Sequence, residues 1–418
     1  MRPFAEDLLL PYRVGVDGPF GAVEATHLLA RTEFGAAPER LEDVLALGLE
    51  KSLLQILQDT PAHDPWAAMG LRMAFAENRA GLQAWWLRRM IDTPAPWHER
   101  LAHFWHDHFA CSDDKVHDLA SMTRQNLVFL AHGNGSFGTL LHEIMKDPAL
   151  LFFLDNGENS RLAPNENLAR ELLELFTVGI GHFDEADVKQ AARALTGWGV
   201  FGRRFAFVKA MHDDGEKAVL AESGAFDGAG LVEVCLRSKW TAQSIATKLC
   251  QAFVAPVASD AMRSTLGTMF REVDLDVGRF MHRLFGSRLF FASRDRLIKS
   301  PCEFVVGLHR SLKIRPDALV LAQRVGQMGE ELYFPPSVAG WERGPAWLSS
   351  GAVLLRQHFA RDLATVSIEP PSARDAYRTL RGTPPDARLQ TWLDEVTASA
   401  GPAEALALVL SLPEMQTW

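Results

Sequence analysis

The sequence predicts an all-α protein, made of two packed helical lobes with one small β-hairpin between them. Three observations support this class. Apolar residues recur at the helical spacing i, i+3, i+4, i+7 along most of the chain. Hydrophobic residues make up 47% and charged residues 23% of the 418 residues, as in ordinary globular proteins. Strand-like alternation occurs only within residues 204–222.

The length predicts more than one structural unit, because domains usually contain about 100–200 residues. We expect an N-terminal helical lobe over residues 1–203, and a connector with the hairpin over 204–228. A C-terminal helical lobe is expected over 229–418. In the first lobe, helices are expected near residues 25–33, 40–58, 66–90, 97–109, 121–132, 137–147 and 165–176. Asp184 with Asp187 then indicates the capped start of a helix that ends before Gly197.

The connector carries the hairpin signals. Phe205 and Phe207 alternate with smaller residues, Asp213-Asp214-Gly215 is a turn sequence, and Ala218–Leu220 can form the return strand. In the second lobe, helices are expected near residues 241–253, 260–271, 277–286, 302–312 and 317–330. The apolar segment 406–412 indicates that the chain ends in a docked helix.

Composition excludes several classes of function. The net charge of −9, from 43 basic and 52 acidic residues, argues against nucleic acid as a partner. No segment approaches the length of a membrane span, and the N-terminus lacks the features of a secretory signal, so the sequence predicts a soluble, cytoplasmic protein. The cysteines form no CxxC pair and are expected to be small buried hydrophobes; they are Cys111, Cys235, Cys250 and Cys302. The oligomeric state does not follow from these observations.

The first candidate for chemistry is the histidine-rich segment at residues 103–109. On a helix, His108 falls within the apolar stripe, whereas His103, His106 and Asp107 fall on the opposite, expected solvated side. His108 is either a core histidine with satisfied ring nitrogens or an acid/base group or ligand. His103 and His106 form a weaker metal candidate, because nothing near them in the sequence completes a site.

The second candidate is the charged helix that begins near residue 166. Glu166, Arg170 and Glu174 form a ladder of opposite charges at i, i+4, i+8, beside a stripe of Asn167, Glu171 and Glu174. This pattern is typical of a solvated face with ordinary salt bridges. Glu171, however, borders the apolar face, where a carboxylate needs a partner. Two such carboxylates with a histidine could hold a divalent metal, but the Glu-x-x-His pairs of helical-bundle metal sites are missing.

The third candidate is the turn that ends the first strand of the expected hairpin. His212 beside Asp213 could be an oriented base or ligand, and Lys217 follows within the same turn. Acidic residues are also common in turns for conformational reasons alone. Neither a serine-hydrolase elbow nor a glycine-rich nucleotide loop is present in the sequence.

Several blocks of the sequence share an order and spacing with a known family. They are Arg31–Gly35, Phe104–Phe109, Asn165–Gly179, Ala191–Trp198, His212–Lys217, Lys299–Glu303 and Pro335–Trp341. Together they resemble the signature blocks of the bacterial "domain of unknown function eighteen-hundred" family. The resemblance extends from about residue 25 to the end of the chain.

This resemblance implies a mainly helical protein with a small β element and no established activity. Relatives are often exported and are encoded beside a phosphatase/sulfatase-like family, which suggests a periplasmic or exported setting and a partner of that kind. The chain departs from many relatives in lacking a leader and in having His106-Asp107 before His108. The positions that the resemblance marks are His108, Glu166, Asn167, Arg170, Glu171, Glu174, His212, Asp213 and Lys217.

Two functions from different classes fit these observations. The first is a binding or accessory protein in which buried polar networks, with Arg170 and Arg193 paired to helix carboxylates, keep the lobes in register. The alternative is a hydrolase or metal-assisted enzyme, whose site combines His108, a carboxylate of the 171–174 helix and the turn at 212–213. Because each of these groups needs a polar partner, we expect all three segments to lie around one cavity.

Overall fold

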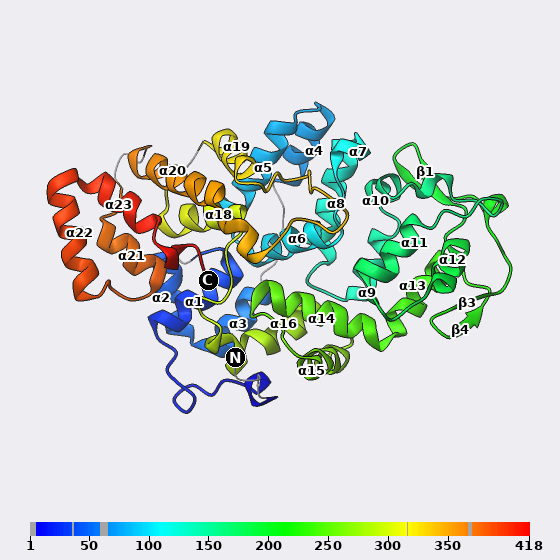
Figure 1. The fold of residues 1–418 in the computed structure, drawn as a ribbon, viewed down its shortest axis with the longest axis horizontal. Helices are drawn as coiled ribbons and strands as arrows, with labels where there is room; N and C mark the ends of the chain where they lie inside the picture. The colour runs from blue at the N-terminus through cyan, green and yellow to red at the C-terminus, as the bar shows by residue number, and fades with distance from the viewer. Residues whose placement is uncertain (1–5, 36, 59–65, 316, 367–369) are drawn as a thin grey trace.

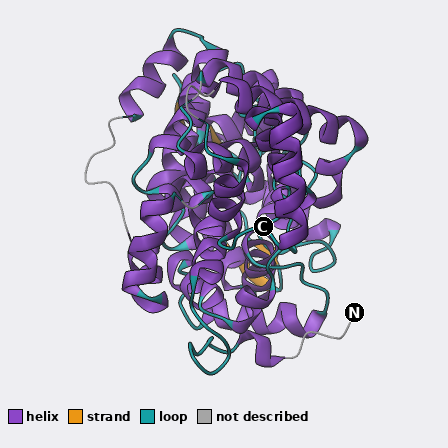
Figure 2. Cartoon of the chain, turned by 90° about the vertical axis from the view of Figure 1, so that its left-hand side faces the viewer, coloured by secondary structure: helices purple, strands orange, loops and turns teal. Residues whose placement is uncertain are grey.

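The computed structural model describes residues 6–35, 37–58, 66–315, 317–366 and 370–418. Helices form most of the described chain, with the few strand residues set among them (Figure 2). Figure 1 shows α20–α23 at one end of an elongated molecule, the strands with α10–α13 at the other end, and α6, α14 and α18 between them. The prediction of a mainly helical protein with a small β element is confirmed.

The first half of the chain contains the helices that position the candidate residues near its middle. In chain order they are α1 (Ala22–Glu33), α2 (Pro38–Leu47), α3 (Leu49–Gln58), α4 (Ala67–Phe75), α5 (Arg79–Asp92), α6 (Pro96–His108), α7 (Asp113–Val116), α8 (Leu119–His132), α9 (Phe137–Ile144), α10 (Pro148–Phe153), α11 (Asn167–Glu171) and α12 (Glu185–Ala194). A π-helix, η3 (Leu172–Phe176), continues directly from α11.

The second half of the chain is organised in the same manner. Its helices are α13 (Gly228–Arg237), α14 (Lys239–Phe253), α15 (Asp260–Arg271), α16 (Val277–Phe285), α17 (Arg288–Ala292), α18 (Pro301–Leu312), α19 (Ala318–Gln327), α20 (Ser350–Val366), α21 (Ala373–Arg381), α22 (Ala387–Ala400) and α23 (Pro402–Leu410). Single 3-10 turns lie at Glu6–Leu9, Asn156–Glu158, Lys209–Met211, Gly344–Leu348 and Pro413–Met415. None of the helices that the structure describes has the length and hydrophobicity of a membrane span.

Local sequence signals account for several helix boundaries. The Asp184 side chain accepts hydrogen bonds from the first turn of α12, and Asp187 completes a capping box, as predicted. The expected helix at 40–58 is divided between α2 and α3 at Gly48, which has a positive φ of 76°. The expected helix at 66–90 is divided between α4 and α5, where Glu77 has a φ of 52°. The expected docked helix at the end of the chain is α23, whose apolar side chains are buried.

The strands pair differently from the predicted hairpin. β1 (Trp198–Phe201) pairs with β2 (Arg204–Phe207), and β3 (Lys217–Val219) pairs with β4 (Glu222–Gly224), both antiparallel. Two-residue turns explain this, because Gly202 with Arg203 and Leu220 with Ala221 all have positive φ, as tight hairpins require. The Asp213–Gly215 turn therefore joins two small hairpins and does not pair β2 with β3.

One continuous apolar core contains helices from both expected lobes. Helix α5 packs against α18 and α19, α1 packs against α21, and α3 packs against α16. Near the centre, Trp97 and Phe104 of α6 contact Phe253 of α14 at ring-centroid distances of 5.2 and 5.5 Å. The four cysteines are free and buried in this core, as expected. Helix α6 is thus surrounded by segments that are distant in sequence.

A buried ion pair joins α6 to α18. Arg100 Nη1 lies 2.5 Å from Glu303 Oε1, and the arginine side chain is 1% exposed. Burial acts to raise the pKa of Glu303, but the Arg100 charge and the backbone N–H of Ser300 outweigh it and lower that pKa to about 2. The Glu303 carboxylate therefore stays ionised inside the protein at neutral pH.

We expect Glu303→Gln to lower the free energy of unfolding by about 3–5 kcal/mol at pH 7, because Arg100 would remain buried without its carboxylate. The folded-state pKa of Glu303 lies below its unfolded value, so its stabilising effect is lost as the pH falls toward 2. The difference between wild type and variant should therefore shrink in acid. Urea unfolding at pH 7 and pH 3 measures both effects.

The matched control for this experiment is Glu331→Gln, which removes an exposed ion pair with Arg79 at 2.7 Å. Exposed pairs contribute roughly 0–1 kcal/mol, so the control should be nearly as stable as wild type. Equal losses for the two variants would contradict the assigned role of the Arg100–Glu303 pair.

Candidate functional site

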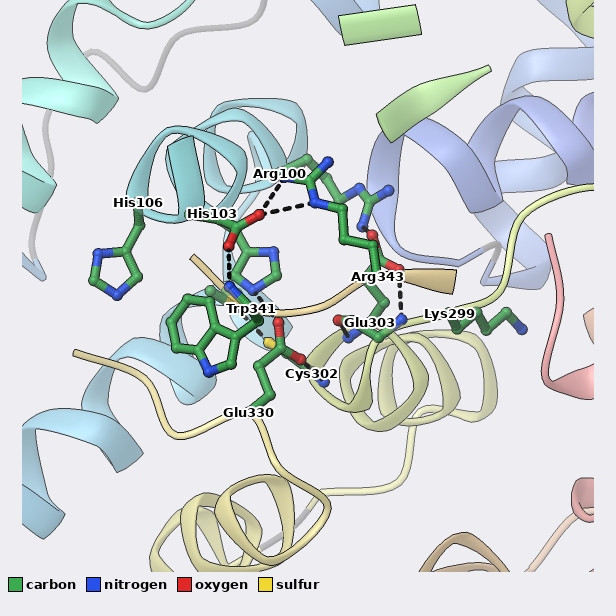
Figure 3. Close-up of polar contacts among 12 residues, drawn as sticks. Arg100, His103, His106, Lys299, Cys302, Glu303, Glu330, Trp341 and Arg343 are labelled. Carbon is green, nitrogen blue, oxygen red and sulfur yellow. Dashed lines mark hydrogen bonds and ion pairs between the residues drawn. The ribbon is translucent and has the colours of Figure 1, made fainter. Parts of the chain in front are cut away.

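The side of α6 that carries Arg100, His103, His106 and Asp107, called here the polar face of α6, is buried. The prediction that His103 and His106 are solvated is wrong, because their exposed fractions are 7% and 1%. Glu303, Glu330 and the loop residues 333–343 cover this side of the helix with polar groups that match it. In Figure 3, the His103 ring and the Glu330 carboxylate point toward one another, whereas the His106 ring lies apart from them. A helical wheel cannot reveal this, because it contains no information about which distant segment covers a face.

His103 pairs with a glutamate that the sequence analysis did not single out. Its Nε2 lies 2.9 Å from Glu330 Oε1, and the other Glu330 oxygen accepts the backbone N–H of Cys302 at 2.7 Å (Figure 3). Burial acts to lower the pKa of His103, but the Glu330 carboxylate outweighs it, so the pKa is raised. This pair therefore links α6, the start of α18 and the segment after α19.

His106 and Asp107 bind the loop that follows α19. His106 Nε2 accepts the backbone N–H of Tyr333 at 3.1 Å, which makes Nδ1 the protonated nitrogen of a neutral ring. Burial lowers the pKa of His106 to about 3. Asp107 accepts the backbone N–H of Trp341 at 2.8 Å and Nε of Arg343 at 2.9 Å. The loop is thus fixed to α6 by backbone as well as side-chain contacts.

Three adjoining cavities follow α6 and α14, and we call them together the α6–α14 groove. The inner cavity, about 110 Å³, is lined by Arg100, His103, Phe104, Asp107, Glu303, Glu330, Trp341, Arg343, Trp347 and Trp418 among others. The middle cavity, about 410 Å³, is lined by Phe104, Asp107, His108, Leu175, Lys248, Gln251, Pro256, Leu297, Val338, Ala339, Arg343 and Gly344. The outer cavity, about 370 Å³, includes Glu174, Leu175, His182, Trp240, Lys248 and Arg263.

The middle cavity contains His108 beside a lysine. His108 is 7% exposed, and its Nδ1 lies 3.5 Å from Nζ of Lys248, which also donates to the backbone oxygen of Leu175. Burial, followed by the Lys248 charge, holds the pKa of His108 well below its ordinary value. Burial also lowers the pKa of Lys248 to about 8. The site therefore combines a neutral imidazole with an amine that loses its proton more readily than a surface lysine.

The two carboxylates of the 171–174 helix differ in environment, because only Glu174 lines a cavity together with Lys248. Glu174 belongs to η3 and lines the outer cavity, which shares Leu175 and Lys248 with the middle cavity. Glu171 is half-buried, and burial followed by the Glu174 charge raises its pKa. A π-helix often marks a functional site, and here it directs Glu174 to the groove. Sequence periodicity predicts the helix but not its change to π geometry.

The remaining polar residues of that helix form surface contacts. Arg170 binds Glu166 at 3.1 Å, as the i, i+4 ladder predicts, but its other partner is Glu185 of α12 at 2.8 Å. The Asn167 amide donates to Asp155 at 3.2 Å. These side chains are partly exposed and connect α11 to its neighbours, so they contribute a network between elements.

The third candidate segment forms its own polar cluster near the hairpins. The His212 ring donates from Nδ1 to the backbone oxygen of Thr196 at 2.9 Å, and Asp213 binds Nε of Arg193 at 2.7 Å. Lys217 Nζ donates to the backbone oxygens of Asp213 and Gly215. The Arg193 hydrogen bonds lower the pKa of Asp213 to about 2. This cluster fixes the turn to α12.

The structure therefore brings the predicted residues together in two groups. His108 and Glu174 line adjoining cavities, with Lys248 common to both. His212 and Asp213 line neither cavity and instead contact Arg193 and Thr196. A single site that combines all of these residues remains a prediction.

Sequence analysis missed Lys248, Asp107 and Arg343 as groove residues. Lys248 lies next to apolar positions of α14, as a lysine that extends its charge to solvent also can, and its tertiary neighbours leave no local pattern. Among the residues that the structure describes, no three histidine, cysteine, aspartate or glutamate side chains are grouped closely enough to hold a metal ion.

Comparisons with known proteins bear on this groove. A family model described as "Protein of unknown function (DUF1800)" matches residues 27–417, nearly the whole chain. No curated protein and no solved structure matches the chain. Three of the sequence blocks that carry the resemblance contribute lining residues to the inner cavity, namely Phe104, Glu303 and Trp341. Segments that are separate in the sequence thus meet at one place in the fold.

Gly340 offers a test of how the loop is fixed to α6. Its φ is 81°, and a Cβ there would lie 2.1 Å from Oδ1 and 2.6 Å from the backbone oxygen of Asp107. We expect Gly340→Ala to lower the free energy of unfolding by about 2–3 kcal/mol. Gly351→Ala is the control, because its Cβ would meet open space within a helix. Urea unfolding compares the two, and equal stabilities would contradict the close approach.

Glu171 provides a second test, because its carboxylate has no arginine partner among the described contacts. The raised pKa means that the ionised carboxylate disfavours the folded state above that pKa. We expect Glu171→Gln to be neutral or stabilising by up to about 1 kcal/mol at pH 7. The difference should vanish as the pH falls and wild-type Glu171 takes up a proton. A loss of about 3–5 kcal/mol in thermal or urea unfolding would instead reveal a buried ion pair.

Proposed function

We propose that this chain, which belongs to the DUF1800 family of proteins of unknown function, is a binding or accessory protein. Its proposed ligand site is a small-anion site in the α6–α14 groove. The observation that carries the proposal is Lys248. Its side chain lines two cavities at once, and its amine lies at the junction between them. A cation in such a position is a natural partner for a carboxylate or phosphate group.

Lys248 lacks an internal counter-charge. No carboxylate of the described residues lies within ion-pair distance of its amine, whose contacts are His108 Nδ1 and the backbone oxygen of Leu175. Asp107 is the acid whose charge favours protonated Lys248, but Asp107 is bound to Arg343. A partly buried ammonium group without an acid partner is costly, and a bound anion would supply the missing charge.

The walls of the middle cavity add a requirement for the ligand. Phe104, Leu175, Leu297 and Val338 provide apolar surface around the polar groups. A cavity of about 410 Å³ is within the size range of small-molecule sites. The proposed ligand therefore carries one anionic group and a compact apolar body.

The paired charges elsewhere support the accessory part of the proposal. Arg100–Glu303 and His103–Glu330 join α6 to α18 and to the segment after α19. These pairs fill the inner end of the groove and give it a defined shape. They therefore support a preformed binding surface between helices.

We expect phosphate and benzoate to bind wild-type protein and to bind Lys248→Met at least about tenfold more weakly, because the variant lacks the counter-charge. Binding should weaken as the free amine forms, by roughly tenfold in total between pH 7 and pH 9. Isothermal titration calorimetry at pH 7 and pH 9 measures both effects.

The control is Lys189→Met, which removes an exposed lysine of α12 and should bind as wild type does. Lys248→Arg keeps the positive charge and should retain most of the affinity. Should Lys248→Met fail to fold, the pH dependence of wild type still tests the site. Affinity that is the same at pH 7 and pH 9 would contradict the proposal.

A hydrolase, with or without a metal ion, is the second candidate function. The observation that favours it is the proximity of two cavities lined by His108 and Glu174, an imidazole and a carboxylate that can activate water. Ester and phosphoester substrates tested with wild type, His108→Gln and Glu174→Gln distinguish the two functions. Hydrolysis that both variants lose, while retaining benzoate binding, would favour the enzyme.

The compartment and the protein partner are further parts of the proposal. The sequence favours a cytoplasmic protein, whereas the family resemblance favours a periplasmic or exported protein with a phosphatase/sulfatase-like partner. Cell fractionation of the full-length native protein separates these alternatives. Co-purification from the same fraction then tests the partner.

A further inference from the structure

We infer that Lys248 also captures a 2-oxo carboxylic acid covalently, through a reversible imine formed in the middle cavity. The inference rests on the proposed function, because the ligand carboxylate would use the same cationic site. Three features carry it: an amine in an open cavity, an imidazole beside that amine, and a second cation at the cavity wall.

The position and the lowered pKa of the Lys248 amine suit it to act as a nucleophile. Lys248 projects from α14 to the junction of the middle and outer cavities, where it is partly exposed. Its pKa of about 8 gives the amine a larger unprotonated fraction near neutral pH than an ordinary lysine has. Unprotonated lysine in a largely apolar pocket is the form that attacks carbonyl groups.

His108 provides a group that can move protons. Its Nδ1 lies 3.5 Å from Nζ of Lys248, so a proton can pass directly or through one water molecule. The ring is neutral, because burial holds its pKa well below the ordinary value. Its Nε2 is buried and meets no described residue with good hydrogen-bond geometry, although the backbone of Phe176 acts on the ring against the lowering of its pKa.

Arg343 provides the second cation for the ligand carboxylate. Nε and one terminal nitrogen of its guanidinium bind Asp107, whereas Nη1 makes no hydrogen bond to a described residue. The side chain is 47% exposed and lines the middle cavity with Lys248. The apolar walls at Phe104, Leu297 and Val338 then suit the side chain of the oxo acid.

The step balances without an oxidant or reductant. The nitrogen lone pair of Lys248 attacks the ketone carbon, and a nitrogen-bound proton moves to the former carbonyl oxygen to give a carbinolamine. A second nitrogen-bound proton is transferred through His108 to the hydroxyl group, which leaves as water while a C=N bond forms. One C=O bond is lost, one C=N bond is gained, and addition of water reverses the reaction.

Reductive trapping tests the inference on the full chain. The protein is incubated with pyruvate or phenylpyruvate and sodium cyanoborohydride, and the modified lysines are identified by peptide mass spectrometry. We expect the Lys248 peptide to be modified at least about tenfold faster than peptides containing the exposed residues Lys51 and Lys189. Phenylpyruvate should react at lower concentration than pyruvate, because it also fills the apolar part of the cavity.

The variants separate this inference from the anion site. Lys248→Arg should retain phosphate and benzoate binding but lose the adduct, and benzoate should slow trapping in wild type. His108→Gln should slow trapping by a larger factor than it weakens benzoate binding, because only trapping uses the ring to move protons. Benzoate binding with no adduct at Lys248, or equal modification of all lysines, would overturn the imine and leave the anion site intact. An adduct at Lys248 that benzoate does not slow would show that the adduct forms without the shared anion site, and it would overturn the inference.

Discussion

Burial of both sides of α6 is the constraint on which the rest of the structure depends. One side packs its aromatic rings against α14, which ordinary hydrophobic burial explains. The other side buries Arg100 and His103, whose removal from water costs several kcal/mol unless each group finds a partner. The partners, Glu303 and Glu330, come from about 200 residues later in the chain. The two halves of the chain are therefore joined by buried charge pairs.

Buried charges are paired at the inner end of the groove but not along its whole length. Toward the inner cavity, each cation on α6 meets a carboxylate, and Arg343 of the covering loop meets Asp107. Farther along, Lys248 meets a neutral imidazole and a backbone oxygen, and Glu174 lies at the wall of the next cavity. The same low-dielectric surroundings that strengthen the pairs make an unmatched charge costly. A polar residue left in this condition is a functional candidate for that physical reason.

Sequence patterns predicted what depends on neighbours along the chain. The helical class, the capping box at Asp184 and the position of His108 within the apolar stripe all follow from periodicity and local hydrogen bonding. The burial of His103 could not be predicted, because the sequence of α6 does not show which distant segment will cover the helix. The predicted strand pairing was wrong for a related reason. The prediction relied on the strong turn sequence at Asp213–Gly215 and overlooked the less obvious turn at Gly202-Arg203. Tertiary partners were the missing information in both cases.

The candidate site shows the same division between local and tertiary information. His108 was found because it interrupts an apolar stripe, and Glu174 was found because it belongs to a ladder of charges on one helix face. Lys248 also interrupts an apolar pattern, but lysine can extend its charge to solvent, so the sequence alone gives no reason to single it out. In the folded protein, a partly buried ammonium group without a counter-charge raises the free energy of the folded state. That free energy falls when the lysine binds an anion or when it loses its proton. The first makes Lys248 a binding group and the second makes it a nucleophile, so both proposals describe states of one side chain.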